Sequence, residues 1–217
     1  MKIIFQNKGE KMEIKYLFNL EETIAKELLK DEKYPWEVLN KIHNYILDLG
    51  KKLDIEKFEQ KEENIWIAKS AKVSPTATII GPAIIDENAE IRHCAFIRGN
   101  VIVGKSAVVG NSTELKNCIL FNEVEVPHFN YVGDSILGYK AHLGAGCIAS
   151  NLRVDKANIK INGLETNLRK IGAFLGDNAQ IGCNSVLNPG TIVGKNALVY
   201  PLSSVIGIIP ENSKYKN

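Results

Sequence analysis

The chain has 217 residues and a formal net charge of +2, and 45% of its residues are hydrophobic, 24% charged and 7% aromatic. This composition excludes wholesale disorder, and the near-neutral charge gives no support for nucleic acid as a partner. No run approaches the roughly 18 apolar residues of a membrane-spanning helix and no signal peptide opens the chain, so we expect a cytoplasmic protein with no membrane partner. The cysteines contain no CxxC pair, which favours reduced thiols over disulfides (Cys94, Cys118, Cys147 and Cys183).

Residues 1–63 favour helices. Asn19 followed by Glu22 is a capping-box pair that predicts a helix over 20–30. Pro35 can start a second helix, with apolar residues at helical spacing up to Gly50. We predict that this segment is an N-terminal helical cap over the open end of the domain that follows, because the ends of a solenoid need covering. A contact with a second copy or another partner is the alternative.

From residue 64 onward an aliphatic residue recurs every six positions. The repeat resumes after two five-residue steps and one longer break, and its inward positions are Ile67, Val73, Ile79, Ile85, Ile91, Ile97, Val103, Val109, Leu115, Leu120, Val126, Val132, Leu137, Leu143, Ala149, Leu175, Ile181, Leu187, Val193, Val199 and Val205. A strand repeats every two residues and a helix near every 3.6, so a period of six fits one short strand plus a corner. A β-sandwich would instead show turn signals every 8–12 residues and no fixed register.

Three such sides close a triangular coil of about 18 residues, and successive coils stack about 4.8 Å apart. The sequence therefore predicts an all-β solenoid, a parallel β-helix of about seven coils over residues 64–209, with 210–217 as a C-terminal tail. Its narrow interior explains why isoleucine is abundant, with 27 residues, while aromatic residues are few. Glycines that follow the aliphatic residue, such as Gly104 and Gly110, are expected to supply positive φ angles at the turns.

The repeat is interrupted at 115–120 and 132–137 and by an insert at 151–170, and such breaks are candidate sites. The insert contains Asn162–Gly163, which is typical of a hairpin turn, and five basic residues against two acidic ones. It is either a solvated loop or an arm that binds an anion. The first 63 residues carry 12 basic and 14 acidic residues and the remainder 15 and 11, so the solenoid is mildly basic.

Arg98 and Lys116 lie 18 residues apart, and each directly follows an inward aliphatic residue. We expect them on one face, one coil apart. Two like charges at that spacing repel unless an anion lies between them, so the pair favours a bound phosphate. Two solvated side chains are the alternative.

Three motifs point to a known family. Residues 128–134 (HFNYVGD), residues 143–146 (LGAG) followed by Asn151, and the pair Arg98 and Lys116 resemble the acetyltransferase domain of the bifunctional enzyme that makes UDP-N-acetylglucosamine. The insert is similar to that of archaeal-type sugar-phosphate nucleotidylyltransferases with an acetyltransferase β-helix. Both belong to the hexapeptide-repeat acyltransferases, whose parallel β-helix is left-handed.

This resemblance implies an acetyl-CoA-dependent N-acetyltransferase that acts on a phosphorylated amino sugar, glucosamine-1-phosphate or a related compound, as a homotrimer with sites between subunits and without a metal. It implies that His128 is the general base. It implies that the acceptor is bound by Arg98, Lys116, Tyr131, His142, Asn151 and Lys160. It implies that acetyl-CoA is bound near Ala145, Gly146, Cys183 and Pro201.

The chain also departs from the family pattern. It contains no Gly-rich nucleotidyltransferase loop, so uridylyl transfer is not expected. His142, Leu152 and Ala157 stand where the relatives have Asn, Tyr and Lys, so the acceptor can differ from glucosamine-1-phosphate.

Two other functions compete with acetyl transfer. The first is a non-catalytic trimeric scaffold or a regulatory subunit for a separate nucleotidyltransferase, which predicts no CoA binding. The second is a γ-type carbonic anhydrase, which needs three zinc-binding histidines, two of them five residues apart. His93, His128 and His142 lack that spacing.

Overall fold

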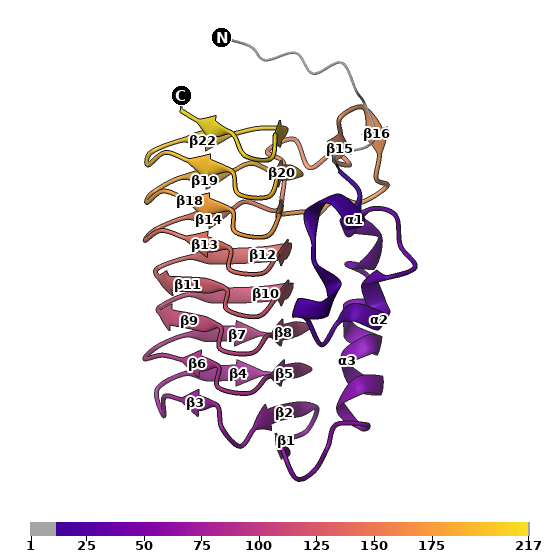
Figure 1. Ribbon diagram of the computed structural model, residues 1–217, viewed down its shortest axis with the longest axis vertical. Helices are drawn as coiled ribbons and strands as arrows, with labels where there is room; N and C mark the ends of the chain where they lie inside the picture. Colours follow the sequence, from indigo (N-terminus) through magenta and orange to yellow (C-terminus); the bar gives the residue numbers. More distant parts are fainter. Residues whose placement is uncertain (1–11, 217) are drawn as a thin grey trace.

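The computed structural model describes residues 12–216, and its body is a parallel β-solenoid with strands on three faces (Figure 1). Face 1 contains β2 (Ile65–Ala68), β5 (Ala83–Ile85), β8 (Val101–Val103), the second half of β10 (Glu114–Leu120), the second half of β12 (Tyr131–Leu137), β17 (Ala173–Leu175), β20 (Thr191–Val193) and β23 (Ile208–Ile209). Within it each strand pairs in parallel with the strand one coil away.

The other two faces are built in the same way. Face 2 contains β3 (Lys72–Val73), β6 (Glu90–Ile91), β9 (Val108–Asn111), β11 (Glu125–His128), β13 (His142–Leu143), β18 (Gln180–Ile181), β21 (Leu198–Val199) and β24 (Lys214–Tyr215). Face 3 contains β4 (Thr78–Ile80), β7 (Phe96–Arg98), the first halves of β10 and β12, β14 (Ile148–Ala149), β19 (Val186–Leu187) and β22 (Ser204–Val205). The predicted parallel β-helix is confirmed.

The solenoid is longer than expected. Face 1 stacks eight strands, where about seven coils were predicted. The repeat continues past Val205, because β23 pairs with β20 and β24 pairs with β21. β23 lies within the predicted solenoid, whereas β24 extends the sheet of face 2 into residues 210–217, which are predicted as a tail.

The predicted inward residues fill the prism. From Ile85 to Val205 they are all buried. The three inward residues of the first coil, Ile67, Val73 and Ile79, are partly exposed, and Val73 is 37% exposed. The first coil therefore lacks a cover over its interior.

The prediction for the turn glycines was wrong. Gly104 and Gly110 are not among the residues with positive φ. A Cβ atom at Gly104 would lie 2.5 Å from the carbonyl carbon of Phe121, so glycine is needed because the next coil passes directly over it. The left-handed corner positions are instead taken by residues such as Asn100 and Asn117, which tolerate this conformation well.

The N-terminal segment lies along the side of the solenoid, not over its open end (Figure 1). It consists of short elements: α1 (Ile14–Leu17), the 3₁₀ turn η1 (Leu20–Glu22), α2 (Lys26–Leu29), the 3₁₀ turn η2 (Pro35–Val38), α3 (Ile42–Gly50) and β1 (Phe58–Glu62), which pairs antiparallel with β2. The helix predicted over 20–30 is broken at Thr23, whose backbone is extended. Residues 1–11 of the predicted cap lie outside the described part.

An apolar column on face 1 explains this position. The outward side chains Trp66, Ile84, Ile102, Ile119, Ile136, Phe174 and Ile192 are all buried, although an outward position on a free solenoid would meet water. Helix α3 contacts β5, β8 and β10, Phe18 packs on Phe121, and Trp36 packs on Phe174. Burial of these side chains removes their apolar area from water, so the hydrophobic effect favours the side position. Isoleucine is thus abundant both inside the prism and on this outer face.

The insert forms the predicted hairpin. β15 (Lys160–Ile161) and β16 (Leu164–Glu165) pair antiparallel around Asn162 and Gly163, which both have positive φ. Its buried side, Ile159 and Ile161, packs on Gly190 of the solenoid. The hairpin is therefore anchored to the later coils.

Candidate functional site

The edge between faces 2 and 3 brings together five of the predicted site residues. We call it the 2/3 edge. Along it the Gly146 amide donates to the His128 carbonyl at 3.0 Å, the Asn184 amide donates to the Ala145 carbonyl at 2.8 Å, and the Leu202 amide donates to the Cys183 carbonyl at 2.9 Å. His128, Ala145, Cys183 and Pro201 therefore occupy the same corner on four successive coils.

His128 is fixed through its backbone, and its side chain is exposed. Its amide donates to Asn130 Oδ1 at 3.2 Å, and the buried Asn130 donates in turn to the Gly144 carbonyl at 2.7 Å. The imidazole lies beside the Phe129 ring at 6.5 Å and has no hydrogen-bonding side chain among residues 12–216. Both ring nitrogens are thus open to a ligand.

The coils above His128 are packed closely at this edge. A Cβ at Gly144 would lie 2.6 Å from the Cys183 nitrogen, and one at Gly182 would lie 2.4 Å from the Pro201 nitrogen. The Gly146 amide is committed to the His128 carbonyl. The Ala145 amide makes no hydrogen bond within the described residues, so it remains available to an oxygen atom of a ligand.

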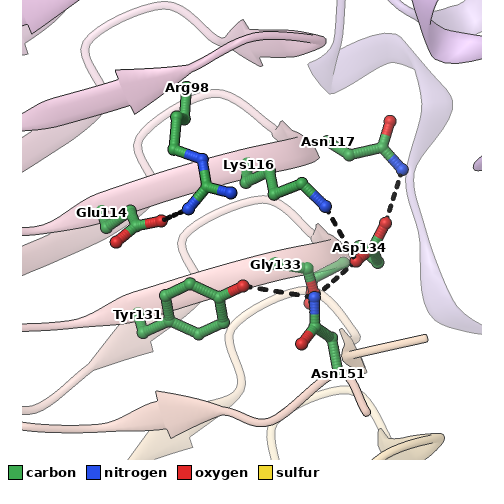
Figure 2. Close-up of polar contacts among 9 residues, drawn as sticks. Arg98, Glu114, Lys116, Asn117, Tyr131, Gly133, Asp134 and Asn151 are labelled. Atoms are coloured by element: carbon green, nitrogen blue, oxygen red, sulfur yellow. Dashed lines mark hydrogen bonds and ion pairs between the residues drawn. The ribbon is translucent and has the colours of Figure 1, made fainter. Parts of the chain in front are cut away.

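Face 3 carries the predicted cationic pair in the predicted register. Ile97 pairs with Leu115, so Arg98 and Lys116 lie one coil apart. Each cation already faces a carboxylate, since Arg98 Nη1 lies 2.5 Å from Glu114 Oε1 and Lys116 Nζ lies 3.9 Å from Asp134 Oδ2 (Figure 2). An anion is therefore not needed to relieve their repulsion, and that part of the argument for phosphate was wrong.

A second polar group adjoins the pair. Asn151 Nδ2 donates to the Tyr131 hydroxyl at 3.2 Å and to Asp134 Oδ2 at 2.5 Å (Figure 2). Gly133 lies beneath this contact, where a Cβ would come within 2.6 Å of the Tyr131 hydroxyl oxygen. Burial and then the charges of Glu114 and Asp134 raise the pKa of Tyr131, so its hydroxyl stays protonated at neutral pH.

Two predicted acceptor ligands lie outside this cluster. His142 is on face 2, where its Nδ1 lies 2.9 Å from Glu125 Oε2. Lys160 is on the exposed insert hairpin and pairs with Glu165. Within one chain neither residue joins Arg98 and Lys116.

Three residues of the cluster were missed by the sequence analysis: Glu114, Asn117 and Asp134. Asp134 is 5% exposed, and its Oδ1 accepts from Asn117 Nδ2 at 2.8 Å. A signal was present, because Asn117 and Asp134 occupy the same corner position 17 residues apart, each at the centre of a register break. Both have a φ of +48°.

The histidines do not form a metal centre. Residues 12–216 contain no group of three His, Cys, Asp or Glu side chains placed to hold a metal ion. Among the described residues no helix is long and apolar enough to cross a membrane.

Comparisons with known proteins match the part of the chain that contains the six-residue repeat. The model of the GMPPB C-terminal domain matches residues 79–168. The bifunctional protein GlmU of Methanococcus vannielii is 35% identical over 186 residues, which are 76% of this chain and 41% of that protein. A bifunctional sugar-1-phosphate nucleotidylyltransferase/acetyltransferase of Sulfurisphaera tokodaii is 29% identical over 182 residues, which are 72% of this chain and 45% of that protein. The chain thus spans less than half the length of these curated relatives.

Solved structures also match. The acetyltransferase domain of PglB from Neisseria gonorrhoeae aligns with a TM-score of 0.37 and 16% identity, over 81% of this chain and 62% of that one. PerB from Caulobacter crescentus, in complex with CoA and GDP-perosamine, aligns with a TM-score of 0.34 and 18% identity, over 80% and 62% of the two chains.

Proposed function

The chain is homologous to the hexapeptide-repeat part of the GlmU-type bifunctional proteins, and from this premise we propose that it is an acetyl-CoA-dependent N-acetyltransferase of a phosphorylated amino sugar. The observation that carries the proposal is the 2/3 edge, where His128, Ala145, Cys183 and Pro201 are stacked on successive coils. The polar cluster of Arg98, Lys116, Tyr131 and Asn151 lies on the adjoining face 3. Glucosamine-1-phosphate is the first acceptor to test.

In the proposed reaction His128 is the general base. A neutral imidazole takes the proton of the acceptor amine as the amine attacks the thioester carbonyl. The C–S bond then breaks, and the imidazolium returns that proton to the sulfur of CoA, which leaves as the thiol. The exposed ring, with no partner among the described side chains, is free to accept that proton.

The developing oxyanion needs a hydrogen-bond donor close to His128. The Ala145 amide suits this role because it is one coil above His128 and makes no other hydrogen bond in the described part. Gly146 does not suit it, because its amide is engaged by the His128 carbonyl. We propose that Gly146 has a structural role at the 2/3 edge, and that Cys183 and Pro201 contact the remainder of CoA.

Arg98 and Lys116 are proposed to bind the acceptor phosphate. At 3.9 Å from Asp134 the Lys116 ammonium is within ion-pair range but beyond a hydrogen bond, so its donors remain available. The remaining guanidinium N–H groups of Arg98 are also available, because within the described part of the chain only Nη1 is engaged. The Tyr131 hydroxyl adds a further donor.

We propose a homotrimer with sites between subunits. Face 1 is covered by the chain's own N-terminal segment, which leaves faces 2 and 3 for contact with a second copy. Such a contact could bring His142 or Lys160 of a neighbouring copy to the acceptor. The four free thiols fit a reducing compartment, so we place the protein in the cytoplasm.

The first experiment is direct. Purified protein is titrated with acetyl-CoA by calorimetry, and release of free CoA is then followed with glucosamine-1-phosphate, galactosamine-1-phosphate, glucosamine-6-phosphate and unphosphorylated glucosamine. We expect acetyl-CoA to bind and a 1-phosphate to be acetylated faster than glucosamine. If acetyl-CoA does not bind, the proposal is wrong.

One observation favours the non-catalytic scaffold as a second candidate. The imidazole of His128 lacks an orienting carboxylate within residues 12–216, and such a group commonly accompanies a catalytic histidine. A scaffold would bind neither acetyl-CoA nor amino-sugar phosphates. The same titration therefore separates the two candidates.

A further inference from the structure

Asp134 is the centre of the polar cluster on face 3 (Figure 2). Its two carboxylate oxygens accept from Asn117 Nδ2 at 2.8 Å and from Asn151 Nδ2 at 2.5 Å, and Lys116 Nζ lies 3.9 Å away. The side chain is almost fully buried. A buried carboxylate is costly unless its oxygens are satisfied, and here both are.

An ionised carboxylate only accepts hydrogen bonds, and this fixes the orientation of both amides. Asn151 must turn its Nδ2 towards Asp134 and cannot present Oδ1 there. The same Nδ2 donates to the Tyr131 hydroxyl oxygen. Asn151 Oδ1 is then left as an acceptor, and the hydrogen of the Tyr131 hydroxyl is left as a donor.

From this network we infer that Asp134 is a positioning residue that sets the hydrogen-bond polarity of the acceptor site. Tyr131 presents a donor beside Arg98 and Lys116, which suits an anionic oxygen such as that of phosphate. Asn151 presents an acceptor, which suits a hydroxyl or amine N–H of the same molecule. This inference rests on the proposed function and narrows its substrate to compounds that combine an anionic group with a neighbouring hydrogen-bond donor.

The local backbone supports this assignment. Gly133 has no Cβ, and a Cβ there would collide with both the Tyr131 hydroxyl at 2.6 Å and Asn151 Nδ2 at 2.8 Å. The Asp134 carbonyl accepts from the Gly172 amide at 2.7 Å, directly after the insert. The end of the insert and the carboxylate are thereby held in one position.

The test compares Asp134→Asn with the wild type by steady-state kinetics and thermal melting. The substitution removes the negative charge and lets the amide of residue 151 turn over. We expect the KM for glucosamine-1-phosphate to rise about tenfold or more, since charge-assisted hydrogen bonds are lost, while the KM for acetyl-CoA changes less than about twofold. If the KM for glucosamine-1-phosphate is the same in the variant as in the wild type, and the KM for acetyl-CoA is also unchanged, the inference is overturned.

Asp177→Asn is the matched control. Asp177 is equally buried and faces a lysine, Lys195, at 2.8 Å, but it lies on the side of the N-terminal segment. This control should lower the melting temperature and leave both KM values unchanged. If Asp134→Asn does not fold, Asn117→Ala leaves the carboxylate in place and frees its Oδ1, and a rise of a few fold in the acceptor KM is expected. An unchanged KM in that variant overturns the inference.

The polarity is tested with inorganic phosphate, which is measured by calorimetry with wild type and Tyr131→Phe. Loss of the donor should weaken binding about threefold to tenfold. Equal affinity overturns the polarity assigned to Tyr131. If the wild type acetylates glucosamine-1-phosphate but Asp134→Asn behaves like wild type, only this inference fails; if the wild type binds neither acetyl-CoA nor a sugar phosphate, the proposed function fails with it.

Discussion

Gly146 donates its amide hydrogen to the carbonyl of His128 at 3.0 Å, which fixes the proposed base directly beneath the coil proposed to hold the thioester. The contact is an ordinary rung of the solenoid ladder. It means that the proposed catalytic group and the proposed CoA-binding edge are set by the same backbone repeat that builds the fold. The positions of the site residues along the edge therefore depend on the register of 17 residues between His128 and Ala145.

Replacement of His128 with Ala should abolish most acetyl transfer and leave the fold intact. General-base catalysis typically contributes about 10²–10⁴-fold, and we expect a loss of kcat in that range. The exposed ring makes no side-chain hydrogen bond in the described part, so the melting temperature should change little. The rate of CoA release, measured at saturating acetyl-CoA, is the readout.

The control for this experiment is His93→Ala. His93 lies on the same edge two coils below His128, and its ring contacts Thr76 and Cys94. It should retain the wild-type rate. Near-wild-type turnover by His128→Ala would exclude His128 as the base.

The solenoid was predictable because its inward residues follow a strict period, and the register that carries Arg98 beside Lys116 followed from the same period. The side position of the N-terminal segment was not predicted. Its signal was present in the outward column that contains Ile84, Ile102 and Ile119, because an uncovered face of a solenoid would carry polar residues at these positions.

Other features of the site depend on contacts that spacing does not show. The carboxylate partners of Arg98 and Lys116 are such a case, since Glu114 is two residues from Lys116 yet pairs with Arg98 one coil away. The pairing of His142 with Glu125 likewise depends on the stacking of face 2. The two residues of each of these ion pairs are separated by 16 to 18 positions, so only the exact register identifies them.

Acetyl-CoA should protect Cys183 from alkylation. Cys183 is exposed on the 2/3 edge, while Cys118 and Cys147 are buried. Burial raises the pKa of both buried thiols above the usual range of a cysteine, which makes them poor nucleophiles. With iodoacetamide at neutral pH we expect Cys183 and Cys94 to be alkylated. The extent of alkylation at each cysteine is measured by peptide mass spectrometry.

Cys94 serves as the internal control. It is exposed on the same edge but lies several coils below Cys183. Saturating acetyl-CoA should slow the alkylation of Cys183 about fivefold or more and leave that of Cys94 unchanged. Equal slowing of the two thiols, or none, would contradict the proposed CoA position.

Replacement of Asp177 with Ala should detach the N-terminal segment from the later coils. Asp177 accepts from the Asn19 amide at 2.8 Å and the Tyr139 amide at 3.0 Å, and it pairs with Lys195. Loss of the carboxylate leaves two amides and an ammonium without their partner, and we expect a destabilisation of about 3 kcal/mol. Urea denaturation measures it.

Limited proteolysis shows where the Asp177→Ala effect is located. Cleavage within 12–57 should become faster than in the wild type, while the solenoid resists. Asn178→Gly, at the same corner, keeps the left-handed backbone of that position, and as the control it should behave like wild type in this assay. Uniform cleavage of the solenoid would mean that Asp177 supports the coils and not the segment.

Asp86 should make the stability of the protein fall as the pH rises. Its side chain is 1% exposed beneath the N-terminal segment, Oδ1 accepts from the Glu87 amide at 2.7 Å, and Oδ2 has no hydrogen-bond partner among residues 12–216. Burial raises the pKa of this carboxyl above the ordinary value of 3.8 for an aspartic acid, although the nearby Lys105 and Lys57 oppose the shift. Both lysines are already engaged by Glu87, so neither neutralises Asp86.

The direction in which stability changes with pH follows from proton linkage. A carboxyl whose pKa is higher in the folded than in the unfolded state binds its proton more tightly when folded, so its contribution to stability is complete below about pH 3.8 and is lost as the pH rises through the folded pKa. Asp86→Asn removes the charge and keeps the acceptor for the Glu87 amide. The free energy of unfolding of the variant minus that of the wild type should therefore increase as the pH rises from about 4 to about 7. Glu62→Gln, at an exposed position on β1, controls for general charge effects, and a difference that stays constant with pH would show that Asp86 does not titrate in this range.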